Sequence, residues 1–331
     1  MTTAMPMPVA SSDTPSSAVI ADCIARRWYR GDCHVHSTHS SGGELTPHQL
    51  VAAARAAGLD FIVGTEHNTA AAHETWRALT SDDLLVLLGQ EVVTREGHWL
   101  ALGLTPGQVI GWDYGAAADS LERQLAEVHR VGGLSVAAHP FAPYPTGTFL
   151  HPYQGFDCFE VWNGPWTSDV PWQADNEAAL AEWARSLAAD VPQGRWRPAI
   201  GNSDTHLDGQ IAIPHTVVAA EALTADALFA GIRAGRSWIA DSADVYLTFS
   251  ASTTAGGVAV RAEVRGVPSG VVTIHNQHGA IHSEALPASP SGTAQCQTSA
   301  SESMFVRIEI RHPSGHMAAL TNPIILNNQS G

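Results

Sequence analysis

The chain has 331 residues and a mass of 35.0 kDa, with 44% hydrophobic and 15% charged residues. This length suits one large domain, or one large and one small domain. Its 17 basic and 32 acidic residues give a formal net charge of −15, and because the chain contains no lysine, every basic residue is an arginine. This composition argues against general binding to nucleic acids or anionic membranes.

Membrane and disulfide patterns are missing from the sequence. No apolar run approaches the roughly 20 residues that a membrane-spanning helix needs, and residues 1–20 lack the pattern of a secretory signal. The cysteines are scattered without the paired spacing of a disulfide framework or a thiolate zinc site. We therefore expect a reduced, cytoplasmic protein. The 17 histidines equal the basic residues in number, so their positions bear most on function.

The N-terminal part of the chain predicts a leader followed by β/α units. Residues 1–20 are rich in Ser, Thr, Pro and Ala, which predicts a disordered leader. Residues 21–243 alternate short apolar runs with helical stretches, as in a parallel sheet or barrel. Thr46 is the predicted N-cap of a first helix, with Pro47 in its first turn, Gln49 three residues after the cap and Gly58 at its end. A buried strand is predicted at 61–64.

The rest of the chain continues this pattern and then changes. Further strands are predicted over 84–90, 99–104, 134–138, 158–162 and 198–200, with helices at 120–131, 176–188 and from 224 onward. From 244 to 331 apolar residues recur with a period of two, which predicts a small antiparallel β domain resembling a sandwich. The stretch 287–303, rich in Ser, Thr and Pro, is predicted to be a long loop. Most histidines and isolated carboxylates follow the predicted strands, where the loops of a β/α barrel form its active site.

The strongest local motif is Asp32-Cys33-His34-Val35-His36. On an extended strand, residues i and i+2 point to the same side, so both imidazoles can reach one metal ion. The alternative is a pair of partly exposed histidines at a strand end. A metal site is favoured because other potential ligands also fall at strand ends or entries of the predicted barrel. They are Glu66, His67, Glu91, His98, His139, Asp204 and His206. Imidazoles and carboxylates without thiolates suit zinc, manganese or iron in a hydrolytic site.

In chain order, the segments CHVHS, TEHN, GQE, GHWLALG, AHP and GNSDTH resemble the polymerase-and-histidinol-phosphatase (PHP) superfamily of metal-dependent hydrolases. GRSWIAD and the closing FVRIEIRHPSG and LTNPIIL resemble its CehA/McbA-type branch, named for carbaryl hydrolases. The resemblance covers residues 28–328. It implies an α/β fold, a distorted (β/α)7 barrel, ahead of the C-terminal β domain, and a centre of two or three divalent ions.

The resemblance also implies a ligand set. His34, His36, Glu91 and Asp204 would hold a first metal ion. Glu91, as a bridge, would hold a second ion together with His98 and His139. A hydroxide between the two ions would be the nucleophile.

A third metal site is less complete in this sequence. His67 and His206 would belong to it, but where family members usually show His-Ser-Asp-Gly and Thr-Asp-His, this chain has Ser41 and Glu66. The third ion is then weakly bound, absent, or held with the help of His39 or Glu66. With two ions, His206 would serve instead as a general acid or as a hydrogen-bond donor to the substrate.

Several residues are candidates for substrate binding. Arg236 resembles a family position near the mouth and would clamp a phosphate or carboxylate and offset its charge during the reaction, or else form a salt bridge with a neighbour such as Asp241. Trp162, Asn163 and Trp166 follow a strand near the expected mouth. The tryptophans would form a wall against a flat organic group, or would pin a loop to the barrel.

Three functions remain open at this point. The first is a phosphoesterase acting on a small organic phosphate, and the second is an ester, carbamate or amide hydrolase with the same metal centre. The third is a non-catalytic binding module in which the centre has decayed. The expected partner is a small-molecule substrate, and the oligomeric state is open.

Overall fold

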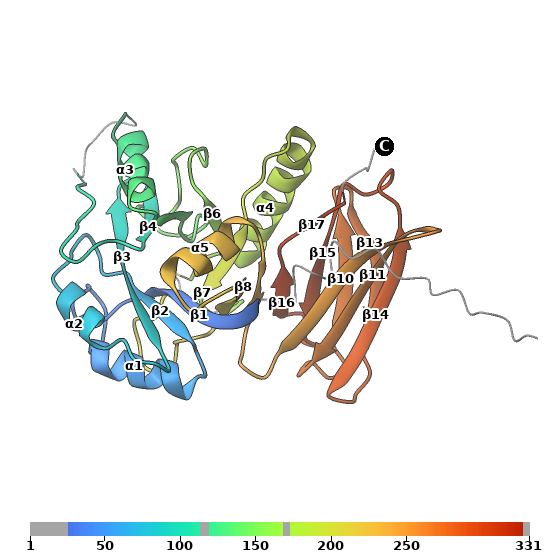
Figure 1. The fold of residues 1–331 in the computed structure, drawn as a ribbon, viewed down its shortest axis with the longest axis horizontal. Coiled ribbons are helices and arrows are strands. Elements are labelled where there is room, and N and C mark those ends of the chain that lie inside the picture. The colour runs from blue at the N-terminus through green and yellow to red at the C-terminus, as the bar shows by residue number, and fades with distance from the viewer. Residues whose placement is uncertain (1–25, 113–118, 168–172, 327–331) are drawn as a thin grey trace, which may run out of the picture.

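The computed structural model describes residues 26–112, 119–167 and 173–326, so the predicted leader at 1–20 lies outside the described residues. Its N-terminal part is a distorted barrel, and its C-terminal part is a β sandwich (Figure 1). The barrel strands are β1 (Arg27–Val35), β2 (Phe61–Gly64), β3 (Leu85–Thr94), β4 (Gly97–Leu102), β5 (Leu134–Ala137), β6 (Cys158–Asn163) and β7 (Ala199–Asn202). The predicted α/β fold class is confirmed.

The barrel strands are neighbours in the order of the chain. β1, β2 and β3 pair in parallel, β4 runs antiparallel to both β3 and β5, and β5, β6 and β7 are parallel again. The end of β7 returns to β1, where Val35 forms an isolated bridge with Thr205 and the His36 backbone N–H donates to the Thr205 carbonyl at 3.0 Å. The sheet therefore curls until the ends of its first and seventh strands meet.

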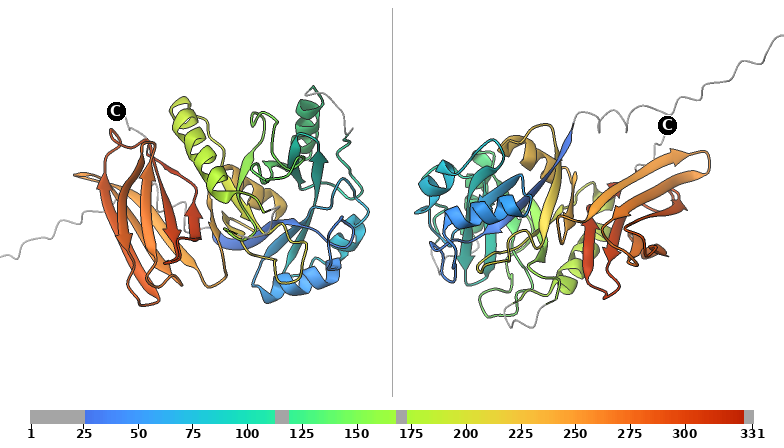
Figure 2. Two further views of the ribbon diagram at one scale, coloured as in Figure 1. Left: turned by 180° about the vertical axis from the view of Figure 1, so that it is seen from behind. Right: turned by 90° about the horizontal axis from the view of Figure 1, so that it is seen from below.

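The described residues form five α-helices, which lie around the outside of these strands (Figures 1 and 2). They are α1 (Pro47–Ala56), α2 (His73–Ala78), α3 (Asp119–Arg130), α4 (Asn176–Asp190) and α5 (Ala225–Arg233), and a short 3-10 turn, Val191–Gln193, follows α4. The predicted capping box of α1 is confirmed, since Thr46 and Gln49 bond reciprocally. Helix α2 was not predicted; its six residues are too few for a periodic apolar face. No helix in the described ranges is long and apolar enough to cross a membrane.

Two strands follow the seven barrel strands, and each runs opposite to the strand with which it first pairs. β8 (His215–Ala220) runs antiparallel to β1, and β9 (Ser237–Ala240) runs antiparallel to β8. β8 was not predicted, because a strand buried along its whole length shows no alternation.

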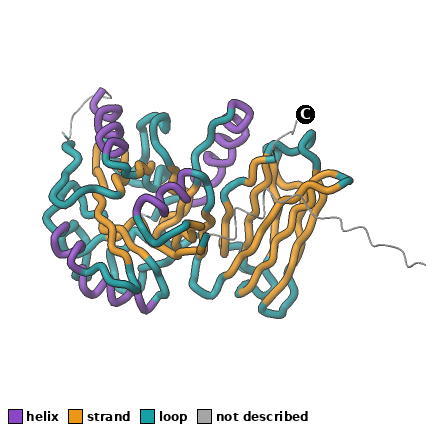
Figure 3. Tube along the Cα trace, in the orientation of Figure 1, coloured by secondary structure: helices purple, strands orange, loops and turns teal. Residues whose placement is uncertain are grey.

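The C-terminal part consists of strands and loops in its described residues (Figure 3). Its strands are β10 (Tyr246–Thr254), β11 (Gly257–Arg265), β12 (Val271–Asn276), β13 (Gly279–Ala285), β14 (Ser291–Thr298), β15 (Phe305–Arg311), β16 (Met317–Thr321) and β17 (Ile324–Ile325). β10, β11 and β14 form one layer, and β13, β12, β15 and β16 form the other. Val260, Val272 and Ile308 belong to the shared core of the two layers. The predicted antiparallel sandwich is confirmed.

One expectation about this part is wrong. The stretch 287–303, predicted as a loop, contains β14, which pairs with β11 along its whole length. The strand is rich in Ser and Thr because one of its faces meets solvent, while Ala294 on the other face is fully buried. The two parts of the chain are also continuous, since Leu320 of β16 pairs with Ile239 of β9. The proposed boundary between residues 243 and 244 stays a prediction.

Candidate metal centre

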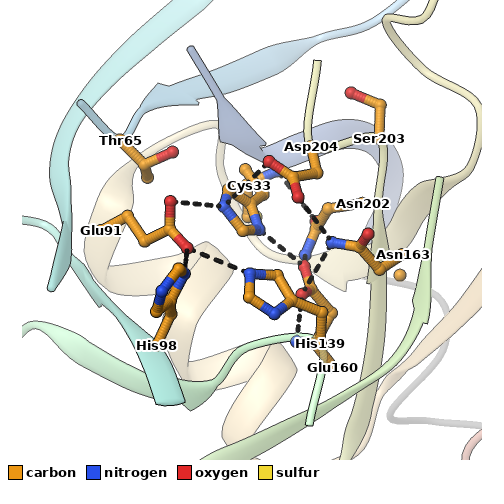
Figure 4. A network of polar contacts seen from close by, with 12 residues as sticks. Cys33, Thr65, Glu91, His98, His139, Glu160, Asn163, Asn202, Ser203 and Asp204 are labelled. Atoms are coloured by element: carbon orange, nitrogen blue, oxygen red, sulfur yellow. Dashed lines mark hydrogen bonds and ion pairs between the residues drawn. The ribbon is translucent and has the colours of Figure 1, made fainter. Parts of the chain in front are cut away.

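The barrel brings the predicted metal ligands to one point. His34 is in β1 and His36 directly follows it, while Glu91 and His98 belong to the antiparallel pair β3 and β4. His139 lies two residues beyond β5, and Asp204 and His206 lie just beyond β7. Figure 4 shows Glu91, His98, His139 and Asp204 converging from these different strands. Strand ends therefore supply most of the ligands, as the sequence predicted.

The first predicted ligand set is assembled in the structure. One ligand atom from each of His34, His36, Glu91 and Asp204 lies within 4.8 Å of the others. His36 Nε2 is 3.2 Å from Glu91 Oε2 and 3.1 Å from Asp204 Oδ1. His34 Nε2 is 3.3 Å from the same Asp204 oxygen. Two imidazole nitrogens and two carboxylate oxygens thus face one another, which suits a divalent ion.

Glu91 joins this first cluster to a second one. Its other oxygen, Oε1, is 2.9 Å from His98 Nδ1 and 3.0 Å from His139 Nε2. Glu91, His98 and His139 form a separate group of possible metal ligands. The two oxygens of one buried carboxylate therefore face two adjoining clusters, which is the geometry expected of a bridging ligand.

A third cluster consists of histidines and has no carboxylate of its own. His36, His67 and His206 each offer a ligand atom within 4.8 Å of the others. The ring centroids of His36 and His67 are 4.4 Å apart, and so are those of His36 and His206. The nearest anion is shared with the other clusters, because His67 Nε2 is 2.9 Å from Glu91 Oε2. An ion here would have three neutral ligands and would be held more weakly than ions at the other two clusters.

Glu66, predicted to help hold a third ion, belongs to none of the groups of possible metal ligands among the described residues. This carboxylate is fully buried and accepts hydrogen bonds from the hydroxyls of Ser37 and Ser40, the Ser37 backbone N–H and Trp76 Nε1. It acts on the cluster indirectly, since the Ser40 oxygen lies 3.2 Å from His36 Nδ1. The Ser40 hydroxyl has one proton, which it donates to Glu66. The Ser40 oxygen therefore accepts the Nδ1–H of His36. This leaves the lone pair of Nε2 facing the ligand cluster.

The sequence analysis missed Glu160, a buried carboxylate that supports His34. Its Oε1 is 3.1 Å from His34 Nδ1 and accepts from Asn202 Nδ2 at 2.8 Å. Its Oε2 accepts from the His139 backbone N–H at 2.8 Å and from Asn163 Nδ2 at 3.1 Å. A carboxylate behind an imidazole fixes the ring and leaves the Nε2 lone pair for a metal. One signal was available, namely a charged residue inside the apolar run of β6.

A second buried carboxylate, Asp32, holds the turn that carries Asp204. It accepts from the backbone N–H and hydroxyl of Ser203 at 3.1 and 2.5 Å, and from the Ala212 N–H at 3.0 Å. Burial raises the pKa of Asp32 to about 6, against these hydrogen bonds. Asp204 itself has φ 51°, in the left-handed region that a non-glycine residue adopts at a cost. The Asp32 bonds help to keep its carboxylate aimed at the cluster.

The carboxylates of the candidate centre lie in close contact with imidazoles, and this contact shifts the pKa values of both kinds of group. Burial alone would raise the pKa of Glu91 and Asp204, but the His34 charge beside both, with His98 beside Glu91, holds each pKa well below its usual range. Burial would lower the pKa of His36, but its contacts with Asp204 and Glu91 raise it to about 9. Both carboxylates are thus kept ionised, and metal ions would displace protons from the imidazoles.

The buried polar atoms of the centre fit metal ions. Among the described residues, three buried atoms that face one another in the first cluster have no hydrogen-bond partner: Nε2 of His34, Nε2 of His36 and Oδ1 of Asp204. Buried polar atoms are almost always satisfied in native proteins, so such a concentration at one point requires an explanation. A divalent ion would accept their lone pairs, and the imidazole and carboxylate donors suit zinc, manganese or iron.

A cavity of about 390 Å³ opens beside the three clusters. Its polar walls include Asn163, which donates to Asp204 Oδ2 at 3.2 Å, and the half-buried Tyr144. The Tyr144 ring lies 6.0 Å from that of His98, and burial raises the pKa of its hydroxyl, which stays protonated. The remaining lining residues include Ala142, Gly164, Pro165, Gln173, Ala174 and Leu207. The cavity therefore offers hydrogen-bond donors and apolar contacts next to the ligand clusters.

Arg236 lies far from this cavity, contrary to the prediction. Its carbonyl accepts from the Ala219 N–H, and Ala219 pairs with Trp28, six residues before His34 along β1. Arg236 is thus at the opposite end of the sheet, where its guanidinium donates to the Ala230 carbonyl. The alternative salt bridge to Asp241 is not formed either, because Asp241 pairs with His312 at 2.6 Å.

The two candidate tryptophans are part of the core and do not line the cavity. Trp162 and Trp166 are 1% and 6% exposed, and their rings meet edge to face at 5.1 Å. Trp162 Nε1 donates to the Gly164 carbonyl, and Trp166 Nε1 donates to Glu177 Oε1 at 2.8 Å. The tryptophans therefore support the loop beneath the cavity wall, which was the alternative interpretation of the sequence.

Comparison with known proteins supports the fold. No family model matches the chain. A two-domain protein from Bacteroides vulgatus, which contains a predicted PHP-like metal-dependent phosphoesterase, is similar with a TM-score of 0.53 and 15% identity over 92% of this chain and 96% of that chain. The lesion-specific endonuclease PfuEndoQ from Pyrococcus furiosus is 17% identical, with a TM-score of 0.42 over 63% of this chain and 56% of that chain.

A relative found by sequence is the uncharacterized protein MJ1587 of Methanocaldococcus jannaschii. It is 25% identical over 125 residues, which are 34% of this chain and 69% of that protein. The two-domain structure shows that this chain shares its fold with that protein over nearly the whole length of both chains. The resemblance predicted from the sequence is confirmed for the fold, and the CehA/McbA branch stays a prediction.

Proposed function

We propose that the protein is a metal-dependent hydrolase of the PHP superfamily that cleaves a phosphoester bond in a small organic phosphate. The observation that carries this proposal is Glu91, whose two oxygens face two adjoining ligand clusters beside one cavity. A carboxylate shared in this way suits a pair of divalent ions, and such pairs catalyse hydrolysis of phosphoesters. We expect two ions at the first two clusters, with a third, weaker site at His67 and His206.

The two ligand clusters would each hold one of the ions that hydrolysis needs. When bound, the divalent ions supply a nucleophile by lowering the pKa of water, and they withdraw charge from substrate oxygens. His34, His36 and Asp204 would hold one ion, and His98 and His139 the other, with Glu91 between them.

The cavity wall would orient the substrate. Asn163 and Gln173 offer amide groups at the wall, and the protonated Tyr144 hydroxyl would donate a hydrogen bond to a substrate oxygen.

His206 fits a ligand or proton acceptor better than the predicted general acid. Its Nδ1 is 2.9 Å from the Asp204 carbonyl oxygen, and because a carbonyl only accepts, Nδ1 carries the proton. Nε2 then has a free lone pair. Burial lowers the pKa of His206, and the Asp204 charge only partly opposes it. A neutral imidazole with this tautomer would bind a third ion or accept a proton from an incoming water.

A second candidate function keeps the metal centre and replaces the phosphoester with the carbonyl of an ester, carbamate or amide. The composition of the cavity wall favours it: the charged groups there are carboxylates and histidines, and Pro165, Ala174 and Leu207 are apolar. The phosphoester is preferred because the similar two-domain structure contains a predicted phosphoesterase. In either case we propose a small-molecule substrate and a cytoplasmic location.

A direct comparison of two substrates tests the proposal. Protein loaded with manganese or zinc is assayed on an aryl phosphate and on the matching aryl acetate and carbamate, with and without inorganic phosphate as a competitor. We expect faster, phosphate-inhibited cleavage of the aryl phosphate. Preferential cleavage of the acetate or carbamate, insensitive to phosphate, would favour the second candidate. Stoichiometric metal binding without cleavage of any of the three would favour a binding module.

A further inference from the structure

The C-terminal β sandwich contacts the loop that forms one wall of the cavity. This loop, residues 163–167, leads from β6 toward α4, and its Asn163, Gly164 and Pro165 line the cavity. The contacts come from one turn of the sandwich, residues 311–316, which joins β15 to β16 and is closed by hydrogen bonds between His312 and residues 315 and 316. We refer to these segments as the wall loop and the 311–316 turn.

Arg311 is the main contact between the two segments. Its guanidinium makes two hydrogen bonds to the Glu177 carboxylate, at 2.6 and 3.1 Å, and lies 5.3 Å from the centre of the Trp166 ring. Glu177 Oε1 also accepts from Trp166 Nε1 at 2.8 Å. A planar guanidinium bound at two points to a carboxylate has a defined orientation, unlike a typical surface ion pair. A further contact joins His316 Nε2 to the Thr167 hydroxyl at 3.0 Å.

Helix α4 transmits this contact to the cavity. Its first residue, Asn176, is 2% exposed and lies next to Glu177. The Asn176 side chain accepts from the Asn163 backbone N–H and donates to the carbonyls of Asn163, Pro165 and Trp166. The Asn163 side chain in turn donates to Asp204. Arg311 is thus linked by hydrogen bonds to Glu177, and Asn176, the neighbour of Glu177 along α4, is hydrogen-bonded to the wall loop.

We propose that the C-terminal β sandwich is a brace for substrate binding, with Arg311 as the positioning residue that holds the wall loop through Glu177 and Trp166. This role rests on the proposed hydrolase function, because the wall loop matters as a substrate contact. The metal clusters meet the wall loop at the Asn163 side chain, but their ligands are held mainly by Glu160, Asp32 and the barrel strands. Loss of Arg311 should therefore weaken substrate binding without reducing metal content.

The test compares R311M with a matched control, R261A. Methionine keeps much of the stem that packs on Trp166 and removes the bonds to Glu177. Arg261 also belongs to the sandwich and pairs with an acidic side chain, Glu263, but this exposed pair lies within β11 and makes no contact with the wall loop. Metal content, KM and kcat on the substrate that the wild type cleaves, and backbone hydrogen exchange of residues 163–167 are measured for each full-length protein.

We expect R311M to raise KM by about threefold to tenfold with kcat within about twofold, to speed hydrogen exchange in the wall loop, and to leave metal content unchanged. R261A should match the wild type in all of these. E177Q keeps an acceptor for Trp166 but weakens the pair with Arg311, so the double variant E177Q/R311M should be no worse than R311M alone.

Each unfavourable result refutes a defined part of the proposal. Unchanged exchange in R311M would overturn the brace, whether or not KM changes. Faster exchange with an unchanged KM, or an equal fall in kcat and metal content, would overturn its role in substrate binding. If the wild type itself cleaves none of the substrates, the proposed function fails, and the hydrogen exchange of R311M still decides whether the sandwich holds the loop.

Discussion

Replacement of Glu160 by glutamine tests the support of the metal centre. The two carboxylate oxygens accept four hydrogen bonds, two each, from His34, Asn202, the His139 backbone and Asn163. A glutamine amide has one oxygen and one NH2 group, so whichever way it turns, two of these four donors face another donor. E160Q therefore loses two bonds to a charged group, each contributing about 1.5 kcal/mol or more.

Two effects should follow from E160Q. The free energy of unfolding of the metal-free protein should fall by about 3 kcal/mol, measured by urea titration. Metal affinity should fall by about 10- to 100-fold, because carboxylates behind metal-binding imidazoles usually have effects of that size. The affinity is measured by competition with a chromogenic chelator for zinc.

An exposed glutamate provides the control. E263Q makes the same chemical change on an exposed strand position of the sandwich, far from the ligands, and should leave zinc affinity unchanged. If E160Q binds zinc as tightly as the wild type and E263Q do, Glu160 does not orient His34 and the reasoning is refuted.

Three further predictions concern other parts of the chain. E91Q should reduce bound metal by more than one ion per chain in elemental analysis, because Glu91 faces both clusters, whereas H67N should reduce it by one ion at most; equal losses would refute the bridging role of Glu91. R236M should keep kcat and KM within about twofold of the wild type, because Arg236 lies at the far end of the sheet; a large fall in activity would contradict this placement. Burial, with Arg30 nearby, lowers the pKa of His215 from 6.5 to about 4. Since the unfolded chain then binds the proton more tightly, this group costs stability as the pH falls from 6.5 toward 4, by up to about 3 kcal/mol. Urea unfolding of metal-free protein at pH 7.5 and 4.5 should show a smaller loss for H215Q, which keeps an acceptor for Arg30, than for the wild type; equal losses would exclude His215 as the cause.

Most of the candidate metal ligands could be predicted because they sit at strand ends, where local sequence determines position. The spacing of His34 and His36 and the polar residues after β5 and β7 depend on only a few neighbouring residues. The family resemblance of the ordered motifs supplied the prediction that Glu91 is shared between two ions, and in the structure its two oxygens face two adjoining clusters.

The error at Arg236 came from the family resemblance, which put this residue near the mouth although it precedes a predicted strand. Side chains near the metal centre come mainly from the ends of the parallel barrel strands, whereas Arg236 stands at a strand entry. β9 is antiparallel to β8, and β8 is antiparallel to β1, so β9 runs in the direction of β1. The residue just before β9 therefore lies at the N-terminal end of the barrel strands, opposite the metal centre.

A second error came from a strand irregularity. Simple alternation would place Glu160 and Trp162 on the same face of β6, but the register shifts between them. Glu160 therefore points to His34, while Trp162 packs with the residues of α4, including Leu180 and Trp183. Such a shift depends on pairing with β7, which the sequence of β6 alone does not reveal.

The dependence of hydrolysis on metal ions tests the central claim most directly. Purified protein is stripped with a chelator, reloaded with increasing amounts of manganese or zinc, and assayed on an aryl phosphate at each measured metal content, beside E91Q treated in the same way. We predict no hydrolysis by the stripped protein, recovery that is complete near two ions per chain, and no recovery in E91Q. Hydrolysis that survives stripping, or equal recovery in E91Q, would contradict a metal centre built around Glu91.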